Sequence, residues 1–170
     1  MDVEDDEPEE GELISRAPTE EDIVAICRLL NAEGAKYIII GGFAVIYSGY
    51  GRTTGDVDLL FDTSAENEAR VYRCLESLPD KAVLHLDPGD VEKYTVVRVA
   101  DEIVVDLMKS ASGIEYAEAA KDIVIREVQG VPIPFASPKL LWRMKKNTHR
   151  QKDAVDLLFL RQQYPEVVEE

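Results

Sequence analysis

Residues 38–61 read IIIGGFAVIYSGYGRTTGDVDLLF, and this stretch carries the clearest signals of fold and function in the chain. An apolar strand leads into a Gly-Gly turn, and a short helix and a polar loop lead on to a second apolar strand. The second strand carries Asp56 and Asp58, which lie two residues apart and therefore point to the same face. Two like charges in an apolar segment are costly unless a cation lies between them. The pair predicts a divalent metal site, and carboxylate oxygens are ligands that suit Mg²⁺ or Mn²⁺.

Asp106 is the best candidate for a third acid, because it is the only charge in the predicted strand 103–108. A two-metal phosphoryl-transfer site needs carboxylates that hold both ions and an acid that takes a proton from the attacking hydroxyl. Any one aspartate could instead accept backbone hydrogen bonds at a strand end or pair with a base, but three together in apolar strands favour the metal site. An EF-hand is excluded, since the residues after Asp56 lack the third ligand and the glycine of that loop.

The composition predicts one soluble domain with an acidic tail. The chain has 170 residues and a net charge of -15, and residues 1–12 hold eight acids and no base, which leaves -7 for the rest. A tail so acidic and free of aromatic residues cannot bury enough surface to fold. We therefore expect a disordered segment over 1–18 and a single domain over 19–165. The acidic N-terminus does not resemble a signal peptide, and no apolar run could span a membrane, so we expect a cytoplasmic protein.

Hydrophobic periodicity predicts an α+β domain with a mixed β-sheet, flanking helices and a C-terminal helical pair. Cys27 and Cys74 fall on the apolar faces of predicted helices, so we expect two buried free thiols. Pro132 and Pro134 place the last strand at an edge of the sheet. Helices are expected over 19–33, 64–78, 113–120, 138–147 and 150–163, and strands over 36–40, 56–61, 82–86, 93–99, 102–108, 122–128 and 131–135.

A basic segment precedes and enters the last helix. It places six bases within fourteen residues and no acid among them: Lys139, Arg143, Lys145, Lys146, Arg150 and Lys152. The segment is either a solvated helix face or a clamp for a triphosphate or polyanionic acceptor. Asp156 lies one turn after Lys152 and is expected to steady it. Arg52, in the loop before the acidic strand, contacts phosphates, positions the acceptor or pairs with an acid such as Asp56.

Gly41-Gly42, thirteen intervening residues, the run DVDL at 56–59 and the later strand aspartate together resemble the signature of the nucleotidyltransferase superfamily typified by DNA polymerase β. The small prokaryotic members of abortive-infection and toxin–antitoxin type are the most similar. The resemblance is specific over 38–61, is supported at 103–107 and is looser over 137–157. It implies a nucleotidyltransferase-like mixed sheet, two Mg²⁺ (or Mn²⁺) ions, and transfer of a nucleoside monophosphate from an NTP with release of pyrophosphate.

The resemblance also implies roles for individual residues. Asp56 and Asp58 would bind both metal ions, and Asp106 would bind one and act as the base. Residues expected to contact the nucleotide are Gly41, Gly42, Arg52, Lys139 and Lys152. The glycines suit that role physically, because without a Cβ the backbone N–H groups come close to phosphate oxygens, although a plain turn is the simpler use of two glycines.

The sequence therefore predicts a metal-dependent nucleotidyltransferase. Its acceptor hydroxyl belongs to tRNA, a protein or a small molecule, and a partner protein or a homodimer could complete the acceptor site. The alternative is a non-catalytic, nucleotide-binding protein of the same fold that acts as a toxin–antitoxin or regulatory partner. An RNA-binding module is disfavoured by the overall acidity, because affinity for RNA depends on neutralising phosphates.

Overall fold

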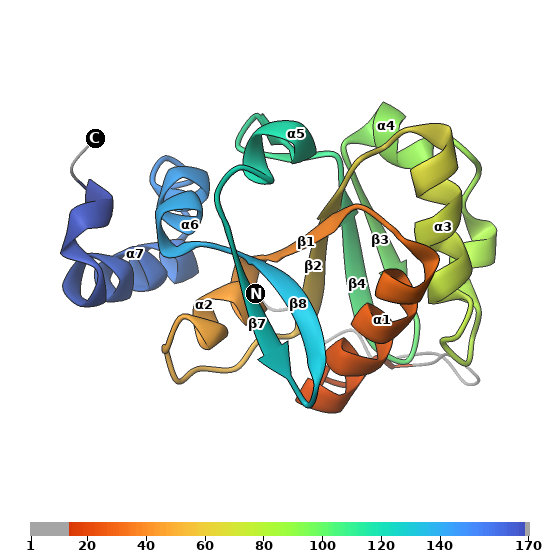
Figure 1. Cartoon of the computed structure of the whole chain (residues 1–170), viewed down its shortest axis with the longest axis horizontal. Coiled ribbons are helices and arrows are strands. Elements are labelled where there is room, and N and C mark those ends of the chain that lie inside the picture. Colours follow the sequence, from red (N-terminus) through yellow and green to blue (C-terminus); the bar gives the residue numbers. More distant parts are fainter. Residues whose placement is uncertain (1–13, 169–170) are drawn as a thin grey trace.

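A mixed six-stranded β-sheet forms the centre of the protein (Figure 1). The computed structural model describes residues 14–168, and within them the strand order is β3-β4-β2-β1-β8-β7. The pairs β2–β4 and β1–β8 are parallel, and the other neighbours are antiparallel. The strands are β1 (Tyr37–Ile40), β2 (Asp56–Phe61), β3 (Val96–Ala100), β4 (Val104–Met108), β7 (Ile123–Val128) and β8 (Val131–Ala136). This confirms the predicted α+β class with a mixed sheet.

Helices surround the sheet, and the last two form the predicted C-terminal pair. In Figure 1, α6 and α7 lie together at one end of the molecule and α3 and α4 lie at the other, with the sheet between them. None of the helices described is long and apolar enough to cross a membrane. The helices are α1 (Glu20–Glu33), α2 (Gly41–Tyr47), α3 (Ala65–Leu75), α4 (Asp90–Tyr94), α5 (Tyr116–Ala119), α6 (Pro138–Lys145) and α7 (Gln151–Gln163). The smaller elements are the 3₁₀ turns η2 (Ala82–His85) and η3 (Pro165–Val168) and the short strands β5 (Ser110–Ala111) and β6 (Ile114–Glu115).

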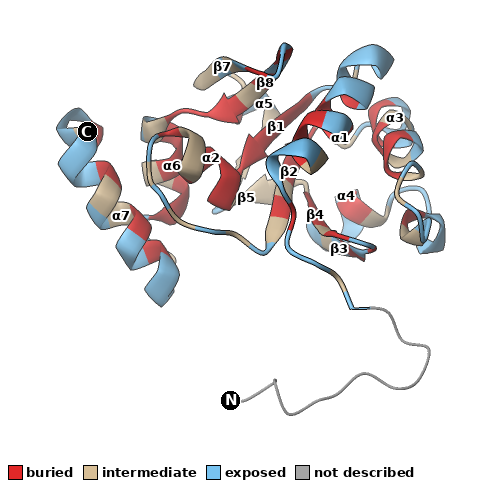
Figure 2. Ribbon diagram, turned by 90° about the horizontal axis from the view of Figure 1, so that it is seen from below, coloured by how far each residue is buried: buried red, intermediate tan, exposed pale blue. Residues whose placement is uncertain are grey.

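The core lies between the central strands and the apolar faces of the helices that cover them. All four residues of β1 are buried, as expected of a strand in the middle of a sheet. Figure 2 shows buried residues running along β1 and β2, whereas much of α7 is exposed. Cys27 on α1 and Cys74 on α3 are both buried free thiols, as the sequence predicts.

The first helix begins and ends where its sequence signals lie. Thr19 caps the first turn and forms a capping box with Asp22, and Gly34 ends the helix in the left-handed conformation at φ 70°. Arg16 precedes the cap and pairs with Asp22 at 2.7 Å and with Glu102 at 2.9 Å. Arg16 belongs to the end of the predicted tail, so this part of the tail contacts the domain, while residues 1–13 lie outside the described residues.

The strand predicted over 82–86 is wrong, because this segment is the 3₁₀ turn η2. The carboxylate of Asp101 accepts hydrogen bonds from the backbone N–H groups of Asp80 and Ala82, at 2.9 and 2.8 Å. Lys81, between them, has a positive φ of 51°. The side chain of Asp101 thus fixes a tight turn where the apolar residues alone suggested an extended chain.

The strand predicted over 93–99 begins later, at Val96, because the residues before it form α4. The buried side chain of Glu68 accepts hydrogen bonds from the backbone N–H groups of Gly89 and Val91, at 2.7 and 3.4 Å. These are N–H groups at the start of a helix, which have no partner within the helix itself. A distant acid therefore stabilises α4 in a way that local periodicity does not reveal.

The prediction that β8 lies at an edge of the sheet is also wrong, since β8 lies between β1 and β7. The backbone N–H of Ser137 donates to the carbonyl of Asp122, so these two residues form a hydrogen-bonded pair next to the β7–β8 ladder. Hydrogen-bonded and non-hydrogen-bonded pairs alternate along an antiparallel ladder, which makes the pairs of Pro134 and Pro132 non-hydrogen-bonded. Pro132 and Pro134 therefore occupy positions that do not need to donate to β7. On the other side, the pairing with β1 is confined to Ile39 and Phe135, so neither proline interrupts that ladder.

Candidate active site

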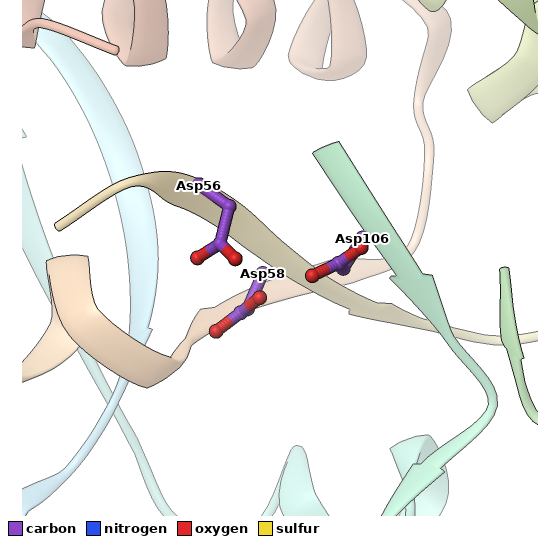
Figure 3. Close-up of side chains that lie close together, drawn as sticks. All are labelled: Asp56, Asp58 and Asp106. Atoms are coloured by element: carbon purple, nitrogen blue, oxygen red, sulfur yellow. The ribbon is translucent and has the colours of Figure 1, made fainter. Parts of the chain in front are cut away.

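The three aspartates that the sequence singles out come together on neighbouring strands. Asp56 and Asp58 extend from one face of β2, and the parallel register of β2 and β4 places Asp58 directly beside Asp106. One carboxylate oxygen from each of the three lies within 4.8 Å of the others. Figure 3 shows the three side chains pointing toward one another. Oxygen donors so close together are a ligand set that fits Mg²⁺ or Mn²⁺.

Burial and mutual repulsion disfavour the charged forms of two of these acids. Burial, followed by the negative charges of Asp56 and Asp106, raises the pKa of Asp58 to about 7. Burial and the charge of Asp106 likewise raise the pKa of Asp56, while Lys152 and Arg98 oppose that shift. Clustered acids with raised pKa values are typical of functional sites, because their cost to stability needs a compensating use.

Arg98 is a site residue that the sequence analysis did not identify. It lies on β3 opposite Asp106, and its Nε and Nη2 donate to the two carboxylate oxygens of Asp106 at 2.9 and 3.0 Å. Nη2 also contacts Asp56 Oδ2 at 3.3 Å. Arg98 is the only charge in β3, but the strand predicted over 93–99 also contains Lys93, so the isolation that selected Asp106 did not stand out for Arg98.

Gly41 and Gly42 stand at the end of β1, against the acidic strand. Gly41 has a φ of 68°, and a Cβ there would lie 1.9 Å from Asp58 Oδ2. A Cβ at Gly42 would lie 2.3 Å from Thr54 Oγ1. A side chain at either glycine would therefore displace a neighbouring side chain, whatever the glycines do for a ligand. Their backbone also lines the cavity described next.

A cavity of about 560 Å³ opens above the acids. The acids and glycines lie along its floor, and one wall comes from α6, α7 and the turn between them. The opposite wall comes from β3, β4 and the segment around β5. The basic residues of the first wall are Lys145, Arg150 and Lys152, and the uncharged residues of the second include Thr95, Val96, Met108 and Ala111.

Two buried aspartates on α7 hold the basic wall in place. Lys145 Nζ lies 2.9 Å from Asp153 and 3.3 Å from Asp156, and all three side chains are almost completely buried. Arg52 makes a two-pronged pair with Asp156 through Nε and Nη2, both at 2.9 Å. Burial raises the pKa of Asp153, but hydrogen bonds from Lys145 and Thr148 outweigh it and bring that pKa down to about 2.

The residues predicted to contact a nucleotide are divided by the structure. Gly41, Gly42, Arg52 and Lys152 line the cavity. Lys139 is exposed and is not among the lining residues.

The structure also distinguishes among the partners that the sequence left open. Arg52 pairs with Asp156, not with Asp56. Asp156 forms ion pairs with Arg52 and Lys145, and among the described residues no ion pair joins it to Lys152. Lys145 and Arg150, which the sequence named only as members of the basic segment, also line the cavity.

No family model matches the chain, and no curated protein matches it in sequence. Among solved structures, the lincosamide antibiotic adenylyltransferase LnuA, bound to lincomycin, is 14% identical with a TM-score of 0.56 over 86% of this chain and 98% of that one. ANT(2")-Ia in complex with adenylyl-2"-tobramycin is 14% identical with a TM-score of 0.55 over 88% and 92%. An antigenic nucleotidyltransferase-like protein from Paracoccidioides brasiliensis is 17% identical with a TM-score of 0.50 over 85% and 75%. The chain therefore has the fold of the nucleotidyltransferases.

Proposed function

We propose that this protein is a metal-dependent nucleotidyltransferase, which moves a nucleoside monophosphate from an NTP to an acceptor hydroxyl and releases pyrophosphate. The observation that carries the proposal is the meeting of three carboxylates on the floor of a cavity that has a basic wall. The fold of the chain is consistent with this activity, since the similar structures include adenylyltransferases. In this function the chain's own acids and bases have distinct tasks.

Asp56, Asp58 and Asp106 would hold two Mg²⁺ or Mn²⁺ ions. When bound, such ions neutralise charge on the reacting phosphate and orient the two oxygens that exchange at phosphorus. Asp106 would also take the proton from the acceptor hydroxyl, because it lines the cavity on β4, on the side that β3, β4 and β5 form. That proton transfer makes the hydroxyl oxygen a better nucleophile at the moment of attack.

The basic wall would hold the triphosphate. Lys152 and Arg150 are exposed residues of the cavity lining, and Arg150 also pairs with Asp153 at 2.8 Å. Lys152 can therefore meet phosphate oxygens directly, and Arg150 can do so with the part of its guanidinium that does not contact Asp153. The positive charge of Lys152 already acts on Asp56 and Asp58, because it partly offsets the rise in their pKa values. Gly41 and Gly42 would add close backbone contacts. Lys139, outside the cavity lining, has no part in this proposal.

The size and lining of the cavity favour a small acceptor. A volume of about 560 Å³ is within the usual range for small-molecule sites. Arg98 is the one base that the wall of β3, β4 and β5 contributes to the cavity lining, and a single base is no row that would follow a nucleic-acid backbone. The acceptors to test first are therefore small hydroxyl compounds. Lincomycin, which is bound in one of the similar structures, and tobramycin, whose adenylyl derivative is bound in another, are two reasonable members of such a set.

Label transfer from NTP tests the proposal directly. The protein is incubated with Mg²⁺ or Mn²⁺, each of the four NTPs labelled at the α-phosphate, and separate pools of RNA, protein and small hydroxyl compounds. Asp56→Asn, which keeps the side-chain shape, is expected to abolish transfer. The matched control is Asp87→Asn, an exposed aspartate outside the cavity lining, and it is expected to transfer like wild type. Transfer that survives Asp56→Asn would show that the site is misassigned.

The same experiment addresses the alternative of a non-catalytic nucleotide-binding protein. NTP that binds with metal but is never transferred to any of the three pools would favour a regulatory or toxin–antitoxin partner. Transfer in one pool only would identify the acceptor class.

A further inference from the structure

Arg98 brings a permanent positive charge into the acidic cluster. Its guanidinium contacts both oxygens of Asp106, at 2.9 and 3.0 Å, and reaches Asp56 Oδ2 at 3.3 Å. Two of the three acids that form the candidate metal site thus share one guanidinium. Arginine remains charged in proteins, so this contact does not depend on pH in any ordinary range.

The sheet aims Arg98 at the acids. Arg98 and Asp106 are direct neighbours across the antiparallel pair β3–β4, where facing side chains start about 5 Å apart. The side chain of Arg98 is nevertheless 60% exposed, whereas that of Asp106 is 9% exposed. The guanidinium can therefore leave the acids for solvent without disturbing the core, while the carboxylate stays in place.

We infer that Arg98 is the resident counter-ion of the acidic cluster: it neutralises Asp106 and Asp56 in the metal-free protein and competes with divalent cations for their oxygens. The identity of the competing cation rests on the proposed function. The counter-ion role itself rests on the observed contacts. Without Arg98, three carboxylates would face one another with no positive charge in direct hydrogen-bond contact among the described residues.

An alternative role for Arg98 is that it only orients the Asp106 carboxylate as a metal ligand. The two roles predict opposite effects on metal affinity. An orienting residue strengthens metal binding, so its removal weakens binding. A competing counter-ion opposes metal binding, so its removal tightens binding. The contact with Asp56 favours competition, because orienting Asp106 does not require a contact with an acid on another strand.

The size of the effect follows from the geometry. The acid oxygens lie within 4.8 Å of one another, and Arg98 contacts two of the acids. An ion shared by these acids would therefore lie about 5 Å from the guanidinium, and removing that unit charge in a water-like medium favours a doubly charged ion by about tenfold in affinity. A water-like medium is appropriate because the Arg98 side chain is mostly exposed.

Mn²⁺ binding to the full chain, followed by electron paramagnetic resonance without nucleotide, tests the inference. Arg98→Met removes the charge and keeps an apolar stem, and it is expected to bind Mn²⁺ about tenfold more tightly than wild type. Arg98→Lys retains the charge and is expected to bind with near wild-type affinity. The control is Arg73→Met, which removes an exposed arginine paired with Glu33 and should not change Mn²⁺ binding.

Thermal unfolding in EDTA provides a readout that needs no metal. Arg98→Met is expected to lower the Tm of the metal-free protein by about 2–4 °C, because the acids lose their counter-ion. In an Asp106→Asn background, the same substitution should lower the Tm clearly less, since its main partner is already neutral. An equal loss in both backgrounds would overturn the counter-ion role.

The outcomes separate this inference from the proposed function. If wild type binds Mn²⁺ and Arg98→Met binds it equally or more weakly, the inference fails and the proposed function stands. If neither protein binds Mn²⁺, competition is refuted and the metal dependence of the proposed function fails with it. Tighter binding by Arg98→Met, in a protein that transfers no nucleotide, would support the inference and refute only the proposed function.

Discussion

Gly41→Ala should damage the acidic site much more than it damages the fold. A Cβ at this position would lie 1.9 Å from Asp58 Oδ2 and 2.8 Å from its Cγ. Contacts of that kind normally exceed 3 Å, so the Asp58 carboxylate must move by at least about 1 Å. The cavity lies beside it, and the carboxylate can rotate into that space. The fold therefore tolerates the change, while one of the three converging oxygens is displaced.

The cost to stability has two parts that a matched control separates. An alanine in the left-handed region costs about 1–2 kcal/mol, and Gly41 has a φ of 68°. Gly34 has nearly the same φ, 70°, with nothing within 4 Å of its added Cβ, so Gly34→Ala carries the backbone cost alone. Moving Asp58 off its rotamer adds about 0.5–1.5 kcal/mol. Gly41→Ala should therefore be less stable than Gly34→Ala by only that second amount.

The functional loss is expected to be larger than the loss of stability. A displacement of about 1 Å at a reacting site costs on the order of 10²-fold in rate. We expect Gly41→Ala to lower nucleotide transfer about 100-fold and to weaken Mn²⁺ binding, and Gly34→Ala to do neither. Urea denaturation in EDTA gives the stabilities, and Mn²⁺ titration gives a second measure of the site.

Two results would refute this reasoning about Gly41. The first is a Gly41→Ala protein with wild-type Mn²⁺ affinity and transfer rate. The second comes from an Asp58→Ala background, where the clashing carboxylate is absent. There Gly41→Ala and Gly34→Ala should cost nearly the same, and a persistent difference would mean that the clash with the Asp58 carboxylate is not the cause.

Two further predictions concern the buried charges around the site. Lys145→Met leaves Asp153 and Asp156 buried without their ammonium partner, so urea denaturation should show a loss of about 3–5 kcal/mol in the free energy of unfolding. The control is Lys146→Met at an exposed position, which should change that free energy by less than about 0.5 kcal/mol. Burial and neighbouring acids raise the pKa of Asp58 from 3.8 to about 7, so the folded metal-free protein binds the Asp58 proton more tightly than the unfolded chain does. The free energy of unfolding should therefore fall as pH rises from about 4 to about 7. Tm measured in EDTA from pH 4.5 to 8 should fall less steeply for Asp58→Asn, and equal slopes would contradict the assignment.

The three acids could be predicted from sequence because the relevant rules are local. The spacing of Asp56 and Asp58 places them on one face of a strand, and Asp106 is the only charge in an apolar strand. What sequence did not provide is the reason they meet, which is the parallel register that pairs Asp58 with Asp106. Strand order and register are set by packing among distant segments, and local periodicity does not encode them.

Arg98 escaped the rule that found Asp106, because the strand predicted over 93–99 also contained Lys93. The cations expected near the acids were metal ions or Arg52, and Arg52 pairs with Asp156 instead. In the structure, the antiparallel pairing of β3 with β4 supplies a cation from the chain itself. An isolated arginine in an apolar strand next to a strand with an isolated aspartate is a detectable signal, provided that the start of the first strand is placed at Val96.

The two glycines show that a structural requirement can lie behind a short sequence motif. The sequence favoured them as a close approach to phosphates. The structure gives a requirement that holds without any ligand, because Gly41 makes room for Asp58 and Gly42 makes room for Thr54. Residues that are distant in sequence impose this requirement, so no motif could have stated it.

The basic segment shows that charges clustered in the sequence do not necessarily form one charged surface on the protein. Its lysines separate into different environments: Lys145 is buried, Lys152 lines the cavity and Lys139 lies outside the cavity lining. The separation follows from Asp153 and Asp156, which lie on one face of α7 because they are three residues apart.

Those two acids attach α7 to α6 through Lys145 and to the loop before β2 through Arg52. Lys152 immediately precedes Asp153, so the anchored helix determines where the Lys152 ammonium stands relative to Asp56 and Asp58. The position of a cation proposed to hold phosphate thus depends on two buried carboxylates, neither of which lines the cavity. A substitution at Asp153 or Asp156 should therefore alter the basic wall of the cavity even though no ligand would touch the substituted residue.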